Sequence, residues 1–283
     1  MQHAGRYVRD AQQVSEVRSE RSEVGKNLTS RKLVFLMNLS YSCKTDIGRV
    51  RSHNEDAVQI FKNEQMLIMV IADGMGGHAF GDVASKMATR YVEGQFNDEL
   101  VFKDKEEVGS WFGDVLTAVN ASILDYAREY KAGKMGTTLV IAVVTEAFIA
   151  FANIGDSRAY ILAYDRLRQV TKDHTFVREL VEKGQISERA ARLHPKKNVI
   201  NKALGASEYL EFDFLTLEKY KVDAILLCTD GLTGLVEDQE ILAVLKTEIA
   251  TNAKVNQLIE KANARGGRDN VSIALVEFKE GVL

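Results

Sequence analysis

Residues 70–78 read VIADGMGGH, an apolar run that ends in an aspartate and continues into a glycine-rich turn. Residues 66–72, MLIMVIA, have the uninterrupted apolar character of a strand that is buried on both faces. A helix is expected over residues 81–96, where small and apolar residues recur at helical spacing. The stretch therefore predicts a strand, a turn and a helix, with Asp73 at the point where a buried strand meets solvent or a ligand.

Three further motifs place an aspartate beside a predicted strand. A single Asp-Gly is an ordinary turn, and an aspartate between a helix and a strand can serve the same purpose. If the strand ends share one edge of the fold, four carboxylates converge, and each raises the pKa of the others unless a counter-charge is present. The motifs are RSHNEDA at 51–57 with Asp56, LLCTDG at 226–231 with Asp230, and GGRDN at 266–270 with Asp269.

A pair of divalent metal ions would relieve this repulsion. Carboxylate oxygens favour Mg²⁺ or Mn²⁺, whereas zinc fits poorly because the chain has five histidines and no HExxH motif. Two such ions can bind a bridging water and lower its pKa, which makes it a nucleophile for attack on phosphorus. Arg51 precedes Asp56 by five residues and could bind phosphoryl oxygens in a bidentate manner, or form a surface salt bridge.

The remaining pattern predicts blocks of strands and helices rather than strict alternation. Consecutive strands in the middle, with helices before and after them, indicate a layered α+β fold. The expected strands lie at 57–61, 138–144, 147–153, 159–163, 223–228 and 271–278, and the expected helices at 108–130, 241–249 and 255–264, with two short helices within 176–193.

The composition excludes several classes of protein. The net charge of -3, without a Lys/Arg run and interleaved aromatics, gives no reason to expect nucleic acid as a partner. No apolar stretch is long enough for a membrane anchor. The two cysteines, Cys43 and Cys228, form neither a disulfide framework nor a zinc spacing, which favours a cytoplasmic location.

The N-terminus differs in composition from the rest of the chain. Residues 1–32 are rich in Arg, Glu, Ser and Gln and contain few large apolar residues. Such a segment cannot offset the entropy cost of ordering, so we expect residues 1–36 to be a disordered extension and residues 37–283 to form the domain. Met37 is an alternative native start.

Taken in order, the motifs resemble the PP2C-type (PPM family) metal-dependent Ser/Thr protein phosphatases, and the bacterial branch most closely. The likeness runs from about residue 43 to 278 and also rests on GTT at 136–138, IGDSR at 154–158 and HPxxNV at 194–199. The resemblance implies a four-layer α-β-β-α sandwich, with a dinuclear metal site at one edge of the central β-sandwich.

The resemblance also implies a role for individual residues. It implies two tightly bound Mn²⁺ or Mg²⁺ ions and a third, weaker ion, and a mobile flap at about 171–205. Arg51 matches the phosphate-binding arginine, and Glu55 matches a position just outside the ligand set. The implied metal ligands are Asp56, Asp73, the Gly74 carbonyl, Asp230 and Asp269, with Asp156 sharing the third ion with Asp230.

Several of these positions allow another interpretation. Asp156 could cap a turn and bind Arg158 instead of a metal. His78 is a candidate general acid, but it could also be a packed or exposed histidine, since a metal-bound water can protonate the leaving group. Cys228 is interpreted as a core residue rather than a nucleophile. Two positions depart from the family pattern: Phe80 is expected to crowd the helix start, and Asn201 to alter contacts within the flap.

The expected function is therefore a protein serine/threonine phosphatase, a hydrolase that cleaves phosphoserine and phosphothreonine with a metal-activated water. Its expected partners are phosphoprotein substrates and a cognate bacterial Ser/Thr kinase that it opposes. Two alternatives stay open. One is a metal phosphoesterase for small molecules, and the other is a non-catalytic pseudophosphatase that binds partners, although such a module should have lost some of the carboxylates.

Overall fold

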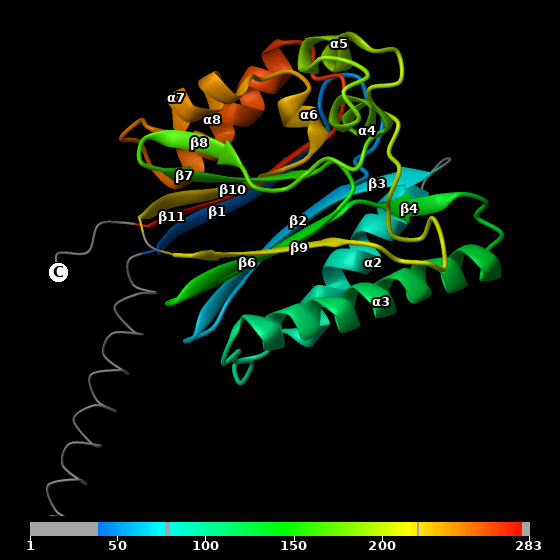
Figure 1. The fold of residues 1–283 in the computed structure, drawn as a ribbon, viewed down its shortest axis with the longest axis horizontal. Helices are drawn as coiled ribbons and strands as arrows, with labels where there is room; N and C mark the ends of the chain where they lie inside the picture. Colours follow the sequence, from blue (N-terminus) through cyan, green and yellow to red (C-terminus); the bar gives the residue numbers. More distant parts are fainter. Residues whose placement is uncertain (1–38, 77–79, 220, 279–283) are drawn as a thin grey trace, which may run out of the picture.

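The computed structural model describes residues 39–76, 80–219 and 221–278. Two antiparallel sheets lie face to face, and helices cover the outer face of each sheet (Figure 1). The predicted α-β-β-α sandwich is therefore confirmed. None of the helices built from the described residues combines the length and apolar character that crossing a bilayer requires. The predicted extension at 1–36 lies outside the described residues.

The first sheet carries the strand from which the sequence analysis began. Its strand order is β2-β3-β5-β6-β9, and a short strand, β4, pairs with the end of β3. The strands are β2 (Asp56–Lys62), β3 (Met66–Gly76), β4 (Met135–Thr137), β5 (Leu139–Thr145), β6 (Phe148–Ile154) and β9 (Asp213–Glu218).

The second sheet contains both ends of the described chain. Its strand order is β1-β11-β10-β7-β8, so the first strand pairs with the last. The strands are β1 (Leu39–Asp46), β7 (Arg158–Ala163), β8 (Arg166–Gln169), β10 (Val222–Cys228) and β11 (Val271–Phe278).

The helices form the two outer layers and the predicted flap. Two long helices pack on the first sheet, three helices cover the second, and two short helices lie between β8 and β9 (Figure 1). The helices are α2 (Phe80–Gln95), α3 (Lys105–Glu129), α4 (Phe176–Glu182), α5 (Glu188–Leu193), α6 (Asp230–Thr233), α7 (Asp238–Leu245) and α8 (Thr251–Ala264).

The position of β3 explains its continuous apolar sequence. Residues 66–72 are all buried because side chains alternate between two apolar layers. Ile68 and Val70 pack toward α2 and α3, whereas Met69 and Ile71 pack into the layer between the sheets. A strand that is buried on both faces shows no polar alternation, as the sequence predicted.

Several predicted boundaries are wrong. The strand does not end at residue 72 but continues to Gly76, because β4 pairs with its last three residues. The helix expected at 241–249 begins at Asp238, where Glu237 and Glu240 form a capping box, and ends at Leu245. Strands β1, β8 and β9 were not predicted, because their side chains are only partly buried.

Candidate metal centre

The register of the first sheet brings two of the predicted aspartates together. Asp56 is the first residue of β2 and lies directly opposite Asp73 on β3. The glycine after Asp73 allows a close approach, since the Gly74 N–H donates to the Glu55 carbonyl at 3.0 Å. A Cβ on Gly74 would lie 2.0 Å from the Gly81 carbonyl oxygen and 2.6 Å from that of Glu55, so only glycine fits.

The second sheet supplies the other two aspartates from neighbouring strands. Asp230 begins α6 two residues after β10, and Asp269 lies two residues before β11, which pairs with β10. A Cβ on Gly231 would lie only 1.8 Å from the Asn270 carbonyl oxygen. This close packing holds the two loops together at the same edge of the sandwich.

The four segments meet at one cavity of about 250 Å³. Asp56 does not line the cavity but lies opposite Asp73, which does. It is 4% exposed, and its Oδ2 accepts hydrogen bonds from Thr229 Oγ1 at 2.9 Å and Ser272 Oγ at 2.7 Å. The cavity is lined by Arg51, Glu55, Asp73, Gly74, Met75, Gly76, Asp156, Asn198, Ile200, Asp230, Asp269 and Asn270. The structure therefore gathers the predicted aspartates within one site.

Burial and mutual repulsion raise the pKa values of four carboxyl groups, those of Asp56, Asp73, Asp156 and Asp230. Burial raises the pKa of Asp56 to about 7, and the charges of Asp230 and Asp269 add to the rise. Burial, with the charge of Asp230, raises the pKa of Asp156 to about 8. Burial, with the charge of Asp269, raises the pKa of Asp230 to about 6. Burial and the surrounding aspartates hold the pKa of Asp73 well above its usual value. A bound cation would remove this penalty.

The donor set fits a hard divalent cation. Around the cavity, four buried carboxylate oxygens have no hydrogen-bond partner among the described residues: Glu55 Oε1, Asp56 Oδ1, Asp156 Oδ1 and Asp230 Oδ1. A buried anionic oxygen without a donor is costly, and carboxylate oxygens are the ligands that Mg²⁺ and Mn²⁺ prefer. In the part of the chain that the structure describes, no three such side chains already form a closed ligand set. The fit therefore rests on the shared cavity, the repulsion and the unpaired oxygens.

Arg51 lies on the wall of the same cavity and is 45% exposed at its side chain. Its Nη2 donates to Asp269 Oδ2 at 2.8 Å, and its Nη1 lies 3.7 Å from Glu55 Oε2. The guanidinium thus forms a salt bridge with Asp269, as one interpretation predicted, on the wall of the cavity.

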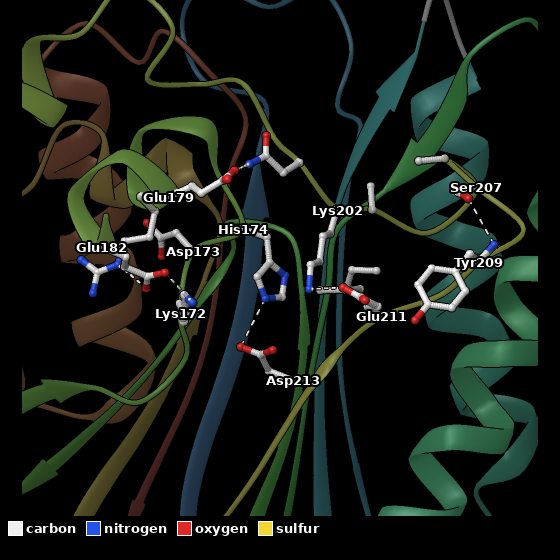
Figure 2. A pocket seen from close by; sticks show the side chains of 15 residues that line it. Lys172, Asp173, His174, Glu179, Glu182, Lys202, Ser207, Tyr209, Glu211 and Asp213 are labelled. Atoms are coloured by element: carbon white, nitrogen blue, oxygen red, sulfur yellow. Dashed lines mark hydrogen bonds and ion pairs between the residues drawn. The ribbon is translucent and has the colours of Figure 1, made fainter. Parts of the chain in front are cut away.

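The predicted flap lies beside the cavity, with Asn198 and Ile200 in its wall. The start of the flap packs against β9 around a separate cavity of about 530 Å³, which is lined by His174 and Asp213 among others (Figure 2). Asn201 makes contacts within the flap, where its Nδ2 donates to Glu179 Oε2 at 3.1 Å.

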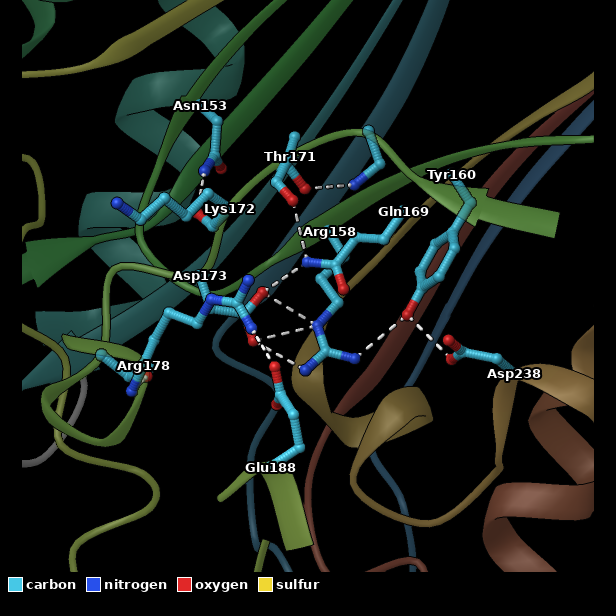
Figure 3. Close-up of polar contacts among 12 residues, drawn as sticks. Asn153, Arg158, Tyr160, Gln169, Thr171, Lys172, Asp173, Arg178, Glu188 and Asp238 are labelled. Carbon is cyan, nitrogen blue, oxygen red and sulfur yellow. Dashed lines mark hydrogen bonds and ion pairs between the residues drawn. The ribbon is translucent and has the colours of Figure 1, made fainter. Parts of the chain in front are cut away.

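Asp156 is 7% exposed and reaches the wall of the cavity from the turn between β6 and β7. The Arg158 guanidinium directs its hydrogen bonds elsewhere. Its Nε and Nη2 donate to Asp173 at 2.6–3.1 Å, and its Nη1 donates to Tyr160 Oη at 3.0 Å (Figure 3). These contacts run against the interpretation of Asp156 as a turn residue that binds Arg158.

Sequence reasoning missed the residues that support the ligands. Asn270 Nδ2 donates to the Ile47 and His53 carbonyls, and its Oδ1 accepts from the Glu55 N–H at 2.9 Å. Thr138 Oγ1 likewise accepts from the Asp73 N–H at 2.9 Å. Asn270 and Thr138 stand in the quoted GGRDN and GTT motifs, and the available signal was the position of Asn270 directly after Asp269.

Three further positions noted in the sequence either do not line the cavity or lie outside the described residues. Cys228 is fully buried in the apolar layer under α7 and α8, as predicted for a core residue. Phe80 begins α2 and packs against the core. His78 lies outside the described residues.

Comparison with known proteins gives a consistent result. The model of the family described as Protein phosphatase 2C matches residues 48–277. The serine/threonine phosphatase stp of Listeria innocua is 41% identical over 236 residues, which cover 83% of this chain and 94% of that protein. The crystal structure of the serine/threonine phosphatase Stp1 from Staphylococcus aureus has a TM-score of 0.80 and 35% identity, and covers 85% of this chain and 95% of that chain. The catalytic domain of the serine/threonine protein phosphatase PstP in complex with two manganese ions has a TM-score of 0.75 and 32% identity, with 86% and 99% covered.

Proposed function

This chain belongs to the protein phosphatase 2C family, and we propose that it hydrolyses phosphoserine and phosphothreonine esters in proteins with a metal-activated water. The observation that carries the proposal is the cavity in which acidic residues from five separate segments meet an arginine. The function is that of a protein serine/threonine phosphatase, a phosphoric monoester hydrolase.

We assign the metal sites to the predicted residues. Asp56, Asp73, Asp230 and Asp269, with the Gly74 carbonyl, would hold two Mn²⁺ or Mg²⁺ ions, and Asp156 with Asp230 would hold a third, weaker ion. The unpaired carboxylate oxygens and the raised pKa values support this assignment. Glu55 would orient the site from beside the ligands, through its contact with Arg51.

When bound, the ions would supply a water of lowered pKa as the nucleophile and would offset charge on the phosphoryl oxygens. Arg51 can exchange its contact with Asp269 for two parallel hydrogen bonds to those oxygens, which would bind the phosphoryl group and set its direction. The ester P–O bond breaks, a new P–O bond forms to the water oxygen, and the seryl or threonyl oxygen takes up a proton. His78 stays a candidate donor of that proton.

The proposal is tested by turnover of a phosphothreonine peptide with Mn²⁺, compared with EDTA and with a phosphotyrosine peptide. We expect metal-dependent hydrolysis of the phosphothreonine peptide and a loss of roughly hundreds-fold in Asp230→Asn, because the substitution is isosteric but removes a ligand charge. Activity that persists in excess chelator would refute the metal role. Better turnover of small phosphate esters than of any phosphopeptide would favour the small-molecule alternative.

The pseudophosphatase alternative is weaker, because all the predicted carboxylates are present and reach one site. We further propose that the enzyme opposes a cognate Ser/Thr kinase and acts in the cytoplasm. The two free thiols of Cys43 and Cys228 support that location. The proposed domain boundary at residue 37 is tested by deleting residues 1–30, which should leave the melting temperature and turnover nearly unchanged.

A further inference from the structure

The first residues of the flap form hydrogen bonds with residues on both sides of Asp156 in the turn between β6 and β7. On one side His174 contacts Gly155, and on the other Asp173 receives the paired hydrogen bonds of Arg158. Figures 2 and 3 show these two neighbouring residues pointing into different surroundings. The flap root and this turn therefore form one connected unit.

His174 and Gly155 exchange two hydrogen bonds. The His174 N–H donates to the Gly155 carbonyl at 2.9 Å, and the Gly155 N–H donates to His174 Nδ1 at 3.1 Å. A nitrogen that accepts an N–H bond carries no proton, so the imidazole is neutral with its proton on Nε2. That atom lies 3.2 Å from Asp213 Oδ2, at the start of β9 (Figure 2). The ring is 5% exposed and lies between the Gly155 N–H and the Asp213 carboxylate.

The Gly155 peptide has little other freedom. Its φ of +105° lies in a region that glycine favours, and a Cβ would lie 2.5 Å from Thr138 Cγ2. Asp156 Oδ1 has no hydrogen-bond partner among the described residues. The carboxylate accepts a hydrogen bond from the backbone N–H of its own residue, so its direction depends on the backbone from which it extends.

We propose that His174 is a positioning residue that sets the orientation of the Asp156 carboxylate by accepting a hydrogen bond from the Gly155 N–H. The imidazole thereby couples the root of the flap to the third cation site. This inference rests on the proposed function, because the third ion is assigned to Asp156 there. His174 lines the separate cavity behind the flap rather than the metal-binding cavity, so it acts through Gly155 and touches no substrate.

Two polar substitutions separate positioning from simple packing. In His174→Asn the amide oxygen can take the place of Nδ1 and accept the Gly155 N–H. In His174→Gln the amide reaches the place of Nε2 near Asp213 and leaves Gly155 without its acceptor. Asn153→Ala is the control, because it removes a different bond to the flap root, from Asn153 Nδ2 to the Lys172 carbonyl at 2.8 Å.

The full chain is examined by amide hydrogen exchange at Gly155 without metal, by Mn²⁺ calorimetry, and by the Mn²⁺ dependence of phosphothreonine peptide turnover. In His174→Gln we expect Gly155 to exchange roughly tenfold faster, as the loss of one buried hydrogen bond predicts. The weak Mn²⁺ site should lose affinity by a similar factor, while the two tight sites and the KM for peptide stay within about twofold. His174→Asn should remain close to the wild-type protein in every readout.

Each remaining outcome either overturns or supports the proposal. Equal behaviour of the Asn and Gln variants, or the same loss in Asn153→Ala, would overturn it in favour of general packing. If His174→Gln does not fold, the ¹⁵N shift of Nδ1 in the wild-type protein decides: a protonated Nδ1 overturns the proposal, and an unprotonated one with a coupling to the Gly155 N–H supports it. If Asp156→Ala leaves the Mn²⁺ dependence unchanged, the coupling fails while phosphatase activity stands. If the wild-type chain hydrolyses no phosphopeptide, the proposed function fails. Amide hydrogen exchange and Mn²⁺ calorimetry then still test whether His174 positions Gly155 and Asp156.

Discussion

Substituting Asp56 by Asn should stabilise the metal-free protein at pH 8 and nearly abolish its activity. Asp56 is 4% exposed, and burial raises its pKa from 3.8 to about 7. The unfolded chain has no such penalty, so ionising this carboxyl costs stability only in the folded state. The amide oxygen of Asn can still accept the bonds that Thr229 and Ser272 donate to Oδ2.

The magnitude follows from the shift. A rise of about three pKa units corresponds to roughly 4 kcal/mol at 1.36 kcal/mol for each unit. A raised folded-state pKa means that the cost is absent below about pH 4, grows as the pH rises toward 7, and is constant above it. The new NH₂ group replaces the unpaired Oδ1, and its own burial offsets about 1–3 kcal/mol. We therefore expect a net gain of about 1–3 kcal/mol at pH 8.

The assay is thermal unfolding in EDTA at pH 4 and pH 8, beside peptide turnover in Mn²⁺. In a domain of this size, each kcal/mol shifts the melting temperature by about 2–4 °C. Asp165→Asn is the control, because Asp165 is 80% exposed at its side chain and pairs with Lys246 on the surface. Excess Mn²⁺ should reverse the order by stabilising the wild-type protein more. A variant that is no more stable than wild type in EDTA at pH 8, or whose gain is the same at pH 4, would refute the reasoning.

Three further predictions concern the rest of the site. Arg51→Ala should raise the KM for phosphopeptide with some loss in kcat, because it removes a phosphate contact and no ligand; a collapse of Mn²⁺ affinity in calorimetry would make Arg51 structural. Asn270→Ala should cost about 2–4 kcal/mol in unfolding and weaken Mn²⁺ binding, because three hydrogen bonds to the segment before Asp56 are lost; unchanged urea midpoints would contradict this. Thiol alkylation should leave turnover unchanged, since Cys228 is fully buried and burial raises its pKa to about 12; loss of turnover with metal still bound would restore a role for the thiol.

The parts of the fold that the sequence predicts well are those in which burial dominates. The continuous apolar run of β3 identified a central strand, because both of its faces are covered. Strand β8, with the sequence RLRQ, was invisible because it lies at the edge of its sheet with two exposed and two partly buried side chains. The extension of β3 through Gly76 was missed because it depends on pairing with β4, which lies about sixty residues away in the chain.

The residues of the candidate site likewise include some that the sequence predicts and others that it does not. The aspartates were found because a carboxylate at the end of an apolar run is conspicuous, and Asp56, Asp73, Asp230 and Asp269 do reach one edge of the fold. Asn270 was missed as a support, because its three partners are backbone groups of a loop more than two hundred residues away. Such partners depend on how the sheets meet, which no local pattern encodes.

Each sheet of the sandwich contributes two of the four aspartates, so the distance between the sheets also sets the distance between the two pairs of carboxylates. The thickness of that layer is set by side chains such as Met69, Phe151 and Ile161, which touch no ligand. A substitution there that keeps the chain folded but moves the sheets by a few tenths of an ångström would alter ion affinity far from the ions. The packing of the protein interior therefore fixes the spacing of the metal ligands. Redesign of this core should impair catalysis before it lowers stability.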